Sequence, residues 1–145
     1  MLETGNHFLS LIMIHVSQTE LILPVPVFIL EDDAIMQQRL KRILLEIGYA
    51  EDALIFAQTL SQAIDMLQQY PISLSLVDLG LPDGNGIDFI ENLRQTDEVS
   101  PILVISAWST QETILKAIQA GATGYLLKER DDFEIMLSIR SILRG

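Results

Sequence analysis

Apolar residues along the chain alternate between short continuous runs and stripes with helical spacing. A short apolar run bounded by Gly, Pro or polar residues is typical of a buried strand. Five such runs occur, within "PVPVFIL" (24–30), "ALIFA" (53–57), "ISLSLV" (72–77), "SPILVISA" (100–107) and "GYLLK" (124–128). We therefore predict five short strands, and Pro24 and Pro26 confine the start of the first.

Each run is followed by a segment that favours a helix. After the first strand, Met36, Leu40, Ile43, Leu44 and Ile47 share one helical face, and Gly48 is placed to end that helix. Four more helices are predicted at residues 60–70, 87–95, 110–120 and 132–143. Capping boxes open three of them, formed by Thr59 with Gln62, Ser109 with Glu112, and Asp131 with Glu134.

This alternation predicts the fold class. Short apolar strands separated by helices are typical of a parallel sheet covered on both faces. We expect one α/β domain over residues 25–145, with a doubly wound five-stranded parallel sheet and five helices in a flavodoxin-like arrangement. Sheets of this kind bind ligands at the carboxyl ends of their strands. Chemistry should therefore be sought just past each strand.

The amino-acid composition excludes several kinds of functional site. The chain has 145 residues, a net charge of -11 and no cysteine, which excludes disulfides and thiolate catalysis. Its nine basic residues begin at Arg39 and form no stripe, so direct nucleic-acid binding by this segment is not expected. Both histidines, His7 and His15, precede residue 16, so the body of the chain must use carboxylates, hydroxyls and lysine.

The first 24 residues are predicted to be an arm outside the core. The apolar stretch at 8–16, "FLSLIMIHV", is too short to span a bilayer, and no Lys or Arg precedes it as in a secretory signal. An alternative is that this arm covers an apolar surface of its own domain or of a partner. No membrane association is expected.

Polar residues stand at four of the predicted strand ends. Glu31, Asp32 and Asp33 follow the first strand, and Asp78, Ser106 and Lys128 follow the third, fourth and fifth. Each alone is commonly a turn, a cap or a surface residue, but the fold class brings them all to one edge. Clustered carboxylates without His or Cys favour a hard cation, Mg²⁺ above all.

These residue types suit phosphoryl transfer. With a cation among the carboxylates, Asp78 could attack phosphorus and form an acyl phosphate. Lys128 would hold the phosphoryl oxygens, and Ser106 would donate a hydrogen bond to one of them. The small residues after Asp78 would leave the phosphorus approachable.

The same residues resemble the receiver domain of two-component response regulators, over residues 25–145. The matching features are the acidic pair Glu31 and Asp32, the phosphoacceptor Asp78, Pro82 and Gly86 in the following loop, the switch hydroxyl Ser106 followed by Ala107, the aromatic switch residue Tyr125, and Lys128. The resemblance implies a cytoplasmic switch, phosphorylated on Asp78 by a sensor histidine kinase with Mg²⁺ bound, and not an enzyme beyond its own phosphorylation and dephosphorylation.

The resemblance also implies finer roles. Asp32 and Asp78 would bind Mg²⁺ directly, Glu31 through water, and Gly80 through its backbone carbonyl. Ser106 and Tyr125 would swing inward on phosphorylation. Glu129 stands where many receivers have proline after the lysine, and "GATGYLLKE" is similar to the NarL/LuxR-type subclass, which acts through a DNA-binding domain. That output domain is expected to be absent from this chain.

Two further features are not part of the motif that carries the resemblance. Gly80 and Trp108 occupy two variable positions that flank the phosphoryl group, and we expect Trp108 to slow attack by water. The helix at 132–143 is apolar over more than half its circumference. Either neighbouring helices cover it, or it forms a homodimer or interdomain face.

Three other functions are alternatives for this set of residues. A phosphatase or phosphotransferase of the haloacid-dehalogenase type needs a second Asp two residues after the nucleophile, where Gly80 stands here. A flavin-binding domain needs a phosphate loop after the first strand, and "EDDAIMQQR" would repel a phosphate. A receiver that signals by binding alone, without phosphorylation, is the third alternative.

Overall fold

The computed structural model describes residues 23–145. Within them, five parallel strands form one sheet in the order β2-β1-β3-β6-β7. The strands are β1 (Val27–Leu30), β2 (Leu54–Ala57), β3 (Leu74–Val77), β6 (Ile102–Ser106) and β7 (Gly124–Leu127). The predicted five-stranded parallel sheet is confirmed. The arm predicted at 1–24 lies outside the described residues, apart from its last two.

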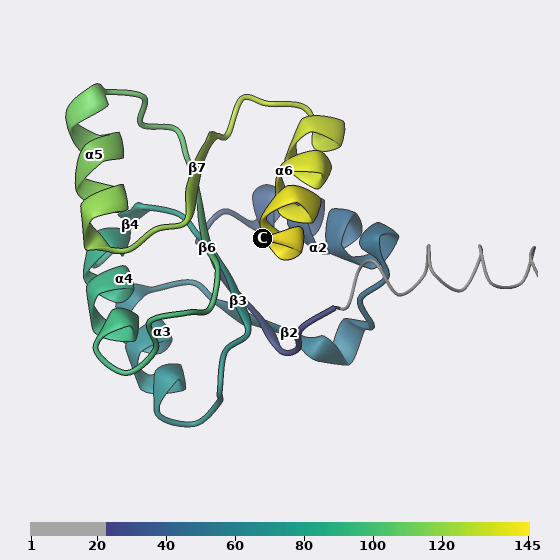
Figure 1. The fold of residues 1–145 in the computed structure, drawn as a ribbon, viewed down its shortest axis with the longest axis horizontal. Helices are drawn as coiled ribbons and strands as arrows, with labels where there is room; N and C mark the ends of the chain where they lie inside the picture. The colour runs from purple at the N-terminus through teal and green to yellow at the C-terminus, as the bar shows by residue number, and fades with distance from the viewer. Residues whose placement is uncertain (1–22) are drawn as a thin grey trace, which may run out of the picture.

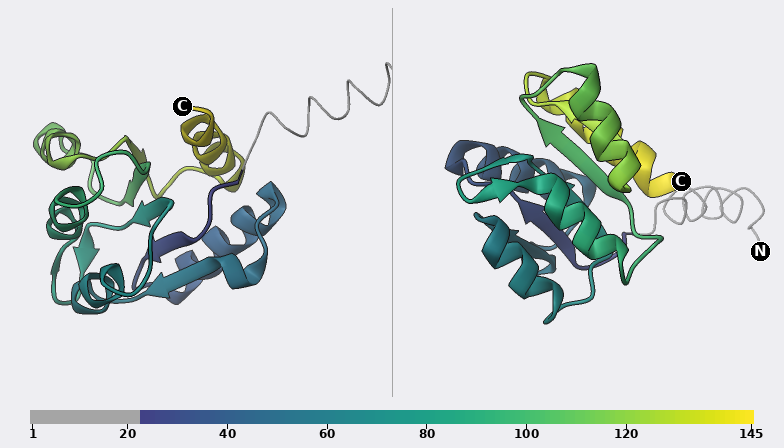
Figure 2. Two further views of the ribbon diagram at one scale, coloured as in Figure 1. Left: turned by 60° about the horizontal axis from the view of Figure 1, so that its bottom comes forward. Right: turned by 90° about the vertical axis from the view of Figure 1, so that its left-hand side faces the viewer.

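In residues 23–145, five α-helices cover both faces of the sheet, as predicted. They are α2 (Ala34–Ile47), α3 (Leu60–Leu67), α4 (Gly86–Arg94), α5 (Gln111–Ala120) and α6 (Asp132–Arg144). Figure 1 shows α3, α4 and α5 stacked on one side of the sheet and α2 and α6 on the other. The left view in Figure 2 shows the same two outer layers with the strands between them. A short 3-10 turn (Glu51–Ala53) precedes β2.

Alternate residues of the strands pack into two hydrophobic core layers, one on each face of the sheet. Val27 and Ile29 of β1 face α2 and α6, whereas Phe28 and Leu30 face the three helices on the other side. The stripe predicted on α2 is buried in the first of these layers. Since both faces of each central strand are buried, β1, β3 and β6 are apolar nearly throughout.

The helix ends confirm one of the three predicted capping boxes and correct the other two. Asp131 and Glu134 form the predicted capping box. Thr59 caps α3, but Gln62 accepts from the Gln58 N–H instead of completing its box. The predicted cap Ser109 is wrong: Thr110 caps α5 by accepting from the Thr113 N–H. Glu112 therefore falls one position short of the third helical residue, from which a box is formed.

The loop after Asp78 contains a small hairpin that the sequence did not indicate. Two-residue strands β4 (Gly80–Leu81) and β5 (Gly84–Asn85) pair antiparallel, with Gly80 opposite Asn85. Asn85 then caps α4. A Cβ atom at Gly86 would overlap the carbonyl of Asp78, which explains the glycine at that position.

No helix in the described part of the chain is both long and apolar enough to cross a bilayer.

Candidate acidic site at the carboxyl edge of the sheet

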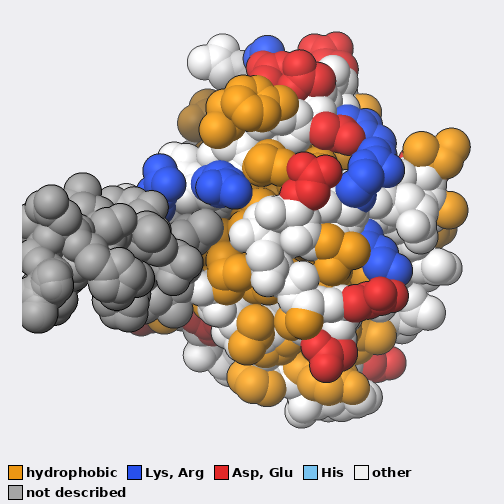
Figure 3. All heavy atoms as spheres, turned by 90° about the vertical axis from the view of Figure 1, so that its right-hand side faces the viewer, with side chains coloured by type: hydrophobic (Ala, Val, Ile, Leu, Met, Phe, Trp, Pro, Cys, Tyr) orange, Lys and Arg blue, Asp and Glu red, His pale blue; other side chains and the backbone are white. Residues whose placement is uncertain are grey.

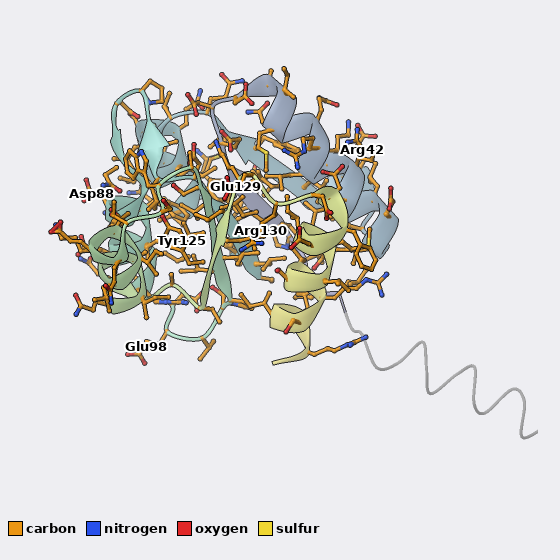
Figure 4. The ribbon with its side chains drawn as sticks, turned by 90° about the horizontal axis from the view of Figure 1, so that it is seen from above. Arg42, Asp88, Glu98, Tyr125, Glu129 and Arg130 are labelled. Carbon is orange, nitrogen blue, oxygen red and sulfur yellow. The ribbon has the colours of Figure 1, made fainter. Side chains whose placement is uncertain are left out.

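The predicted site residues meet at one edge of the sheet. Glu31 and Asp32 follow β1, Asp78 follows β3, and Lys128 follows β7, while Ser106 ends β6. Backbone hydrogen bonds continue past the strand ends, from the Asp78 N–H to the Leu30 carbonyl (2.8 Å) and from the Lys128 N–H to the Ser106 carbonyl (2.9 Å). These bonds fix where each side chain leaves the sheet. Figure 4 looks down on this edge, with Glu129 in the turn after β7.

Three carboxylates form a compact cluster here. One oxygen from each of Glu31, Asp32 and Asp78 lies within 4.8 Å of the others. Glu31 and Asp78 are buried, with 1% and 6% of their surface exposed, whereas Asp32 faces solvent. An all-oxygen set that is open on one side fits Mg²⁺, which retains several waters when bound. Gly80 is two residues past Asp78 and exposed.

Lys128 bridges the two buried carboxylates. Its Nζ lies 2.9 Å from Glu31 Oε1 and 3.1 Å from Asp78 Oδ2. Burial tends to lower the pKa of Lys128, but hydrogen bonds and charges from Glu31 and Asp78 outweigh it and raise that pKa. Burial raises the pKa of Glu31 to about 7, against the opposing effect of Lys128. One ammonium group thus faces more negative charge than it can neutralise, which favours binding of a cation.

Asp33, the third acidic residue of the triplet, has a structural role at the start of α2. Its side chain caps α2 by accepting from the Met36 N–H (3.0 Å), and its own N–H donates to Glu31 Oε2 (3.0 Å). Asp33 therefore orients the Glu31 carboxylate instead of joining the cluster.

The two predicted switch residues both contact the backbone of Trp108. Ser106 Oγ is buried and accepts from the Trp108 N–H (3.1 Å), and the Tyr125 hydroxyl donates to the Trp108 carbonyl (2.6 Å). The Trp108 ring lies beside Gly80, where a Cβ atom would stand 3.3 Å from the ring. Residue 108 thus joins β6, β7 and the loop after Asp78. The inward movement expected of Ser106 and Tyr125 stays a prediction.

The approach to Lys128 is open. A hollow of about 330 Å³ is lined by Ala107, Ser109, Leu127, Lys128 and Glu129. The peptide bond between Lys128 and Glu129 is trans, as the absence of proline there suggested. Lys128 is therefore accessible from this side of the sheet edge.

The sequence did not reveal the role of Asp83. Its two carboxylate oxygens accept from the backbone N–H groups of Leu60 (2.8 Å) and Ser61 (3.0 Å), at the start of α3. These partners precede Asp83 by more than twenty residues, so no local motif signals the contact.

Comparison with known proteins matches most of the chain to one family. A model of the response regulator receiver domain matches residues 27–140. The transcriptional regulatory proteins BasR and PhoP of Escherichia coli (strain K12) are 33% and 30% identical over 118 residues, which is 81% of this chain and 52% of each of those proteins. The chain thus spans about half the length of the curated relatives it matches.

Solved structures show the same fold. A CheY-like receiver domain protein from Methanospirillum hungatei JF-1 is 22% identical with a TM-score of 0.73, over 81% of this chain and 91% of that one. A LuxR family two-component response regulator from Aurantimonas sp. SI85-9A1 is 26% identical with a TM-score of 0.72, over 85% and 87%.

Proposed function

The chain belongs to the response regulator receiver domain family, and on this basis we propose that Asp78 accepts a phosphoryl group and so sets a two-state signalling switch. The supporting observation is the position of the Asp78 carboxylate. It is buried, 3.1 Å from Lys128, and lies in one oxygen cluster with buried Glu31 and exposed Asp32. A strand that ends on such a carboxylate presents it as an acceptor.

Each site residue has a part in the proposed transfer. An Asp78 oxygen forms a bond to phosphorus as the bond to the donor breaks, giving an acyl phosphate. Lys128 stays beside Asp78 and pairs with a phosphoryl oxygen. Ser106 Oγ accepts from the Trp108 N–H, so its own proton remains available for another phosphoryl oxygen.

Mg²⁺ would be held by Asp32, Asp78, the Gly80 carbonyl and, through water, Glu31. When bound, it would neutralise charge on the carboxylates and on the transferred phosphoryl group. The compact oxygen cluster supports this assignment.

The donor and the output follow from the family and its relatives. We propose a sensor histidine kinase as donor and the cytoplasm as the site of action. BasR and PhoP are transcriptional regulators and are longer than this chain, so control of transcription through a separate DNA-binding domain is the proposed output. These relatives favour a BasR- or PhoP-like output over the NarL/LuxR type. That subclass is supported only by "GATGYLLKE" and by the LuxR family structure.

The side formed by α5, β7 and α6 is the proposed output face. Leu115 and Ile118 of α5 and Phe133 and Leu137 of α6 are exposed there, at 50%, 43%, 65% and 49%. The other apolar residues of α6 pack on the core, so neighbouring elements cover only part of the helix. Since Tyr125 of β7 bonds to the Trp108 carbonyl, this face is connected to the site. We propose that α6 forms a homodimer face once Asp78 is phosphorylated.

Intact-mass measurement after incubation with acetyl phosphate and MgCl₂ tests the function. We expect one added phosphoryl group, absent from Asp78→Asn and absent when EDTA replaces MgCl₂. Sedimentation of the same samples tests the dimer, which Leu137→Asp should prevent without changing the mass gain. If neither an adduct nor Asp78-dependent release of inorganic phosphate occurs, the chain signals without phosphorylation and the proposal is wrong.

A further inference from the structure

The hairpin after Asp78 is held to the domain at its tip. Gly80 and Leu81 pair with Asn85 and Gly84, and residues 82–83 form the turn between them. Among the described residues, Asp83 makes the only side-chain hydrogen bonds from this hairpin to another part of the fold, since Asn85 bonds only to the start of the next helix. Asp83 is therefore the polar side-chain link between the hairpin and the rest of the described fold.

The contact is bidentate and satisfies groups that need partners. The first backbone N–H groups of a helix have no acceptor within it. In α3, Thr59 accepts from the Gln62 N–H, which leaves the N–H groups of Leu60 and Ser61 to the two oxygens of Asp83. Hydrogen bonds from the backbone of Ser61 and Leu60 also lower the pKa of Asp83, so its carboxylate is ionised at neutral pH.

Packing holds the hairpin against the same helix. A Cβ atom at Gly84 would stand 2.8 Å from Leu60 Cδ2, so the hairpin backbone lies directly on the Leu60 side chain. Leu81 packs on the core layer to which Leu60 also belongs. The tip is thus fixed by charge on one side and by apolar contact on the other.

We propose that Asp83 is a positioning residue for the Mg²⁺ site, because it holds the hairpin that sets the place of the Gly80 carbonyl. The inference rests on the proposed function, in which that carbonyl is a ligand. Gly80 begins the hairpin two residues after Asp78 and three before Asp83, and its partner Asn85 ends the hairpin. Release of the tip would let this short ladder shift, and groups that orient metal ligands strongly affect metal affinity.

The test is a titration with MgCl₂ followed by ¹H–¹⁵N NMR of the whole chain. Shifts of the amides from Asp78 to Leu81 give the dissociation constant, and the amides of Leu60 and Ser61 report the clamp in the same spectra. The variants are Asp83→Ala, which removes both acceptors, and Asp83→Asn, which keeps one. Asp65→Ala is the matched control, because Asp65 is an exposed acid on α3 with no hydrogen bond from its side chain in the described structure.

We expect Asp83→Ala to raise the Mg²⁺ dissociation constant by about tenfold, the lower end of the range for groups that orient metal ligands. Asp83→Asn should give a smaller increase, and Asp65→Ala should stay within about twofold of the unchanged chain, since it removes only a distant charge. If Leu60 and Ser61 amides shift in Asp83→Ala while the Mg²⁺ affinity does not change, the inference is wrong and the proposed function stands. If the unchanged chain binds no Mg²⁺, both fail together.

Discussion

In the part of the chain that the structure describes, two ionic clusters join residues far apart in the sequence, and they differ in burial. The buried cluster consists of Lys128, Glu31 and Asp78. The surface cluster consists of Asp132 on α6 with Arg39 and Arg42 on α2, at 2.8 and 3.0 Å. Glu31 is 2% exposed at its side chain, whereas Asp132 is 40% exposed.

The surface cluster belongs to an ordinary helix–helix contact. Figure 3 views the side of α2 and α6, where acidic, basic and apolar side chains are interspersed. In Figure 4, Arg42 lies on the outside of the molecule, away from the sheet edge. Water and salt screen charges in such a place, so its pairs contribute little to stability. In the buried cluster the same chemical groups are poorly screened, and each unpaired charge is costly.

Removal of Lys128 should give the largest effect. Lys128→Ala leaves Glu31 and Asp78 buried without their cation, and we expect a loss of roughly 3 kcal/mol in the free energy of unfolding in EDTA, the low end for a broken buried pair because Lys128 is partly exposed. Urea unfolding measures this. Saturating MgCl₂ should restore part of the lost stability. Equal stability of the variant and the unchanged chain in EDTA would show that Glu31 and Asp78 do not need Lys128 to be buried.

The pH dependence of stability should run in opposite directions for the two clusters. Burial raises the pKa of Glu31 from 4.5 to about 7, so the folded state holds its proton more tightly. Its contribution is complete below pH 4.5 and is lost as the pH rises towards 7, by at most about 3 kcal/mol. Hydrogen bonds from Arg42 and Arg39 lower the pKa of Asp132 below 3.8, so its contribution is present above that pH and lost below it.

Unfolding in urea between pH 3 and 8, in EDTA, separates the two contributions. Glu31→Gln should flatten the curve between pH 4.5 and 7, and Asp132→Asn should flatten it only below pH 4. A curve for Glu31→Gln that keeps the full slope above pH 4.5 would assign that slope to other groups.

Access of water to Asp78 should control the lifetime of the proposed acyl phosphate. Trp108 is 43% exposed and its ring lies beside Gly80, next to the proposed acyl phosphate. Trp108→Ala should shorten the lifetime on the order of tenfold, equal to about 1.4 kcal/mol in the barrier, because water gains access. Decay of the mass adduct after removal of acetyl phosphate measures it, with Trp108→Phe as the conservative control. An unchanged or longer lifetime in the alanine variant would remove this role.

Much of the buried cluster could be predicted from the sequence, because topology alone determines it. A parallel sheet brings every strand end to one edge, so Glu31, Asp78 and Lys128 were expected to lie close together. The contact of Asp83 with the Leu60 and Ser61 N–H groups and the bond between Tyr125 and the Trp108 carbonyl could not be predicted. Both join residues distant in sequence through side-chain directions that no periodicity specifies. Ser109 was the wrong cap for the related reason that helix ends vary by a residue or two.

Mutation of the surface cluster should give the smallest change in stability, and it serves as a control for mutation of the buried cluster. Arg42→Ala removes one of two cations from Asp132, and Arg39 remains at 2.8 Å to pair with it. We expect a loss of about 0.5 kcal/mol or less in the free energy of unfolding, as for exposed ion pairs, and a smaller loss in 1 M NaCl, where screening weakens the pair. Lys128→Ala should lose stability in both salt conditions, since a buried charge is screened much less. If Arg42→Ala instead cost as much as Lys128→Ala, and did so regardless of salt, then burial would not be what distinguishes the two clusters.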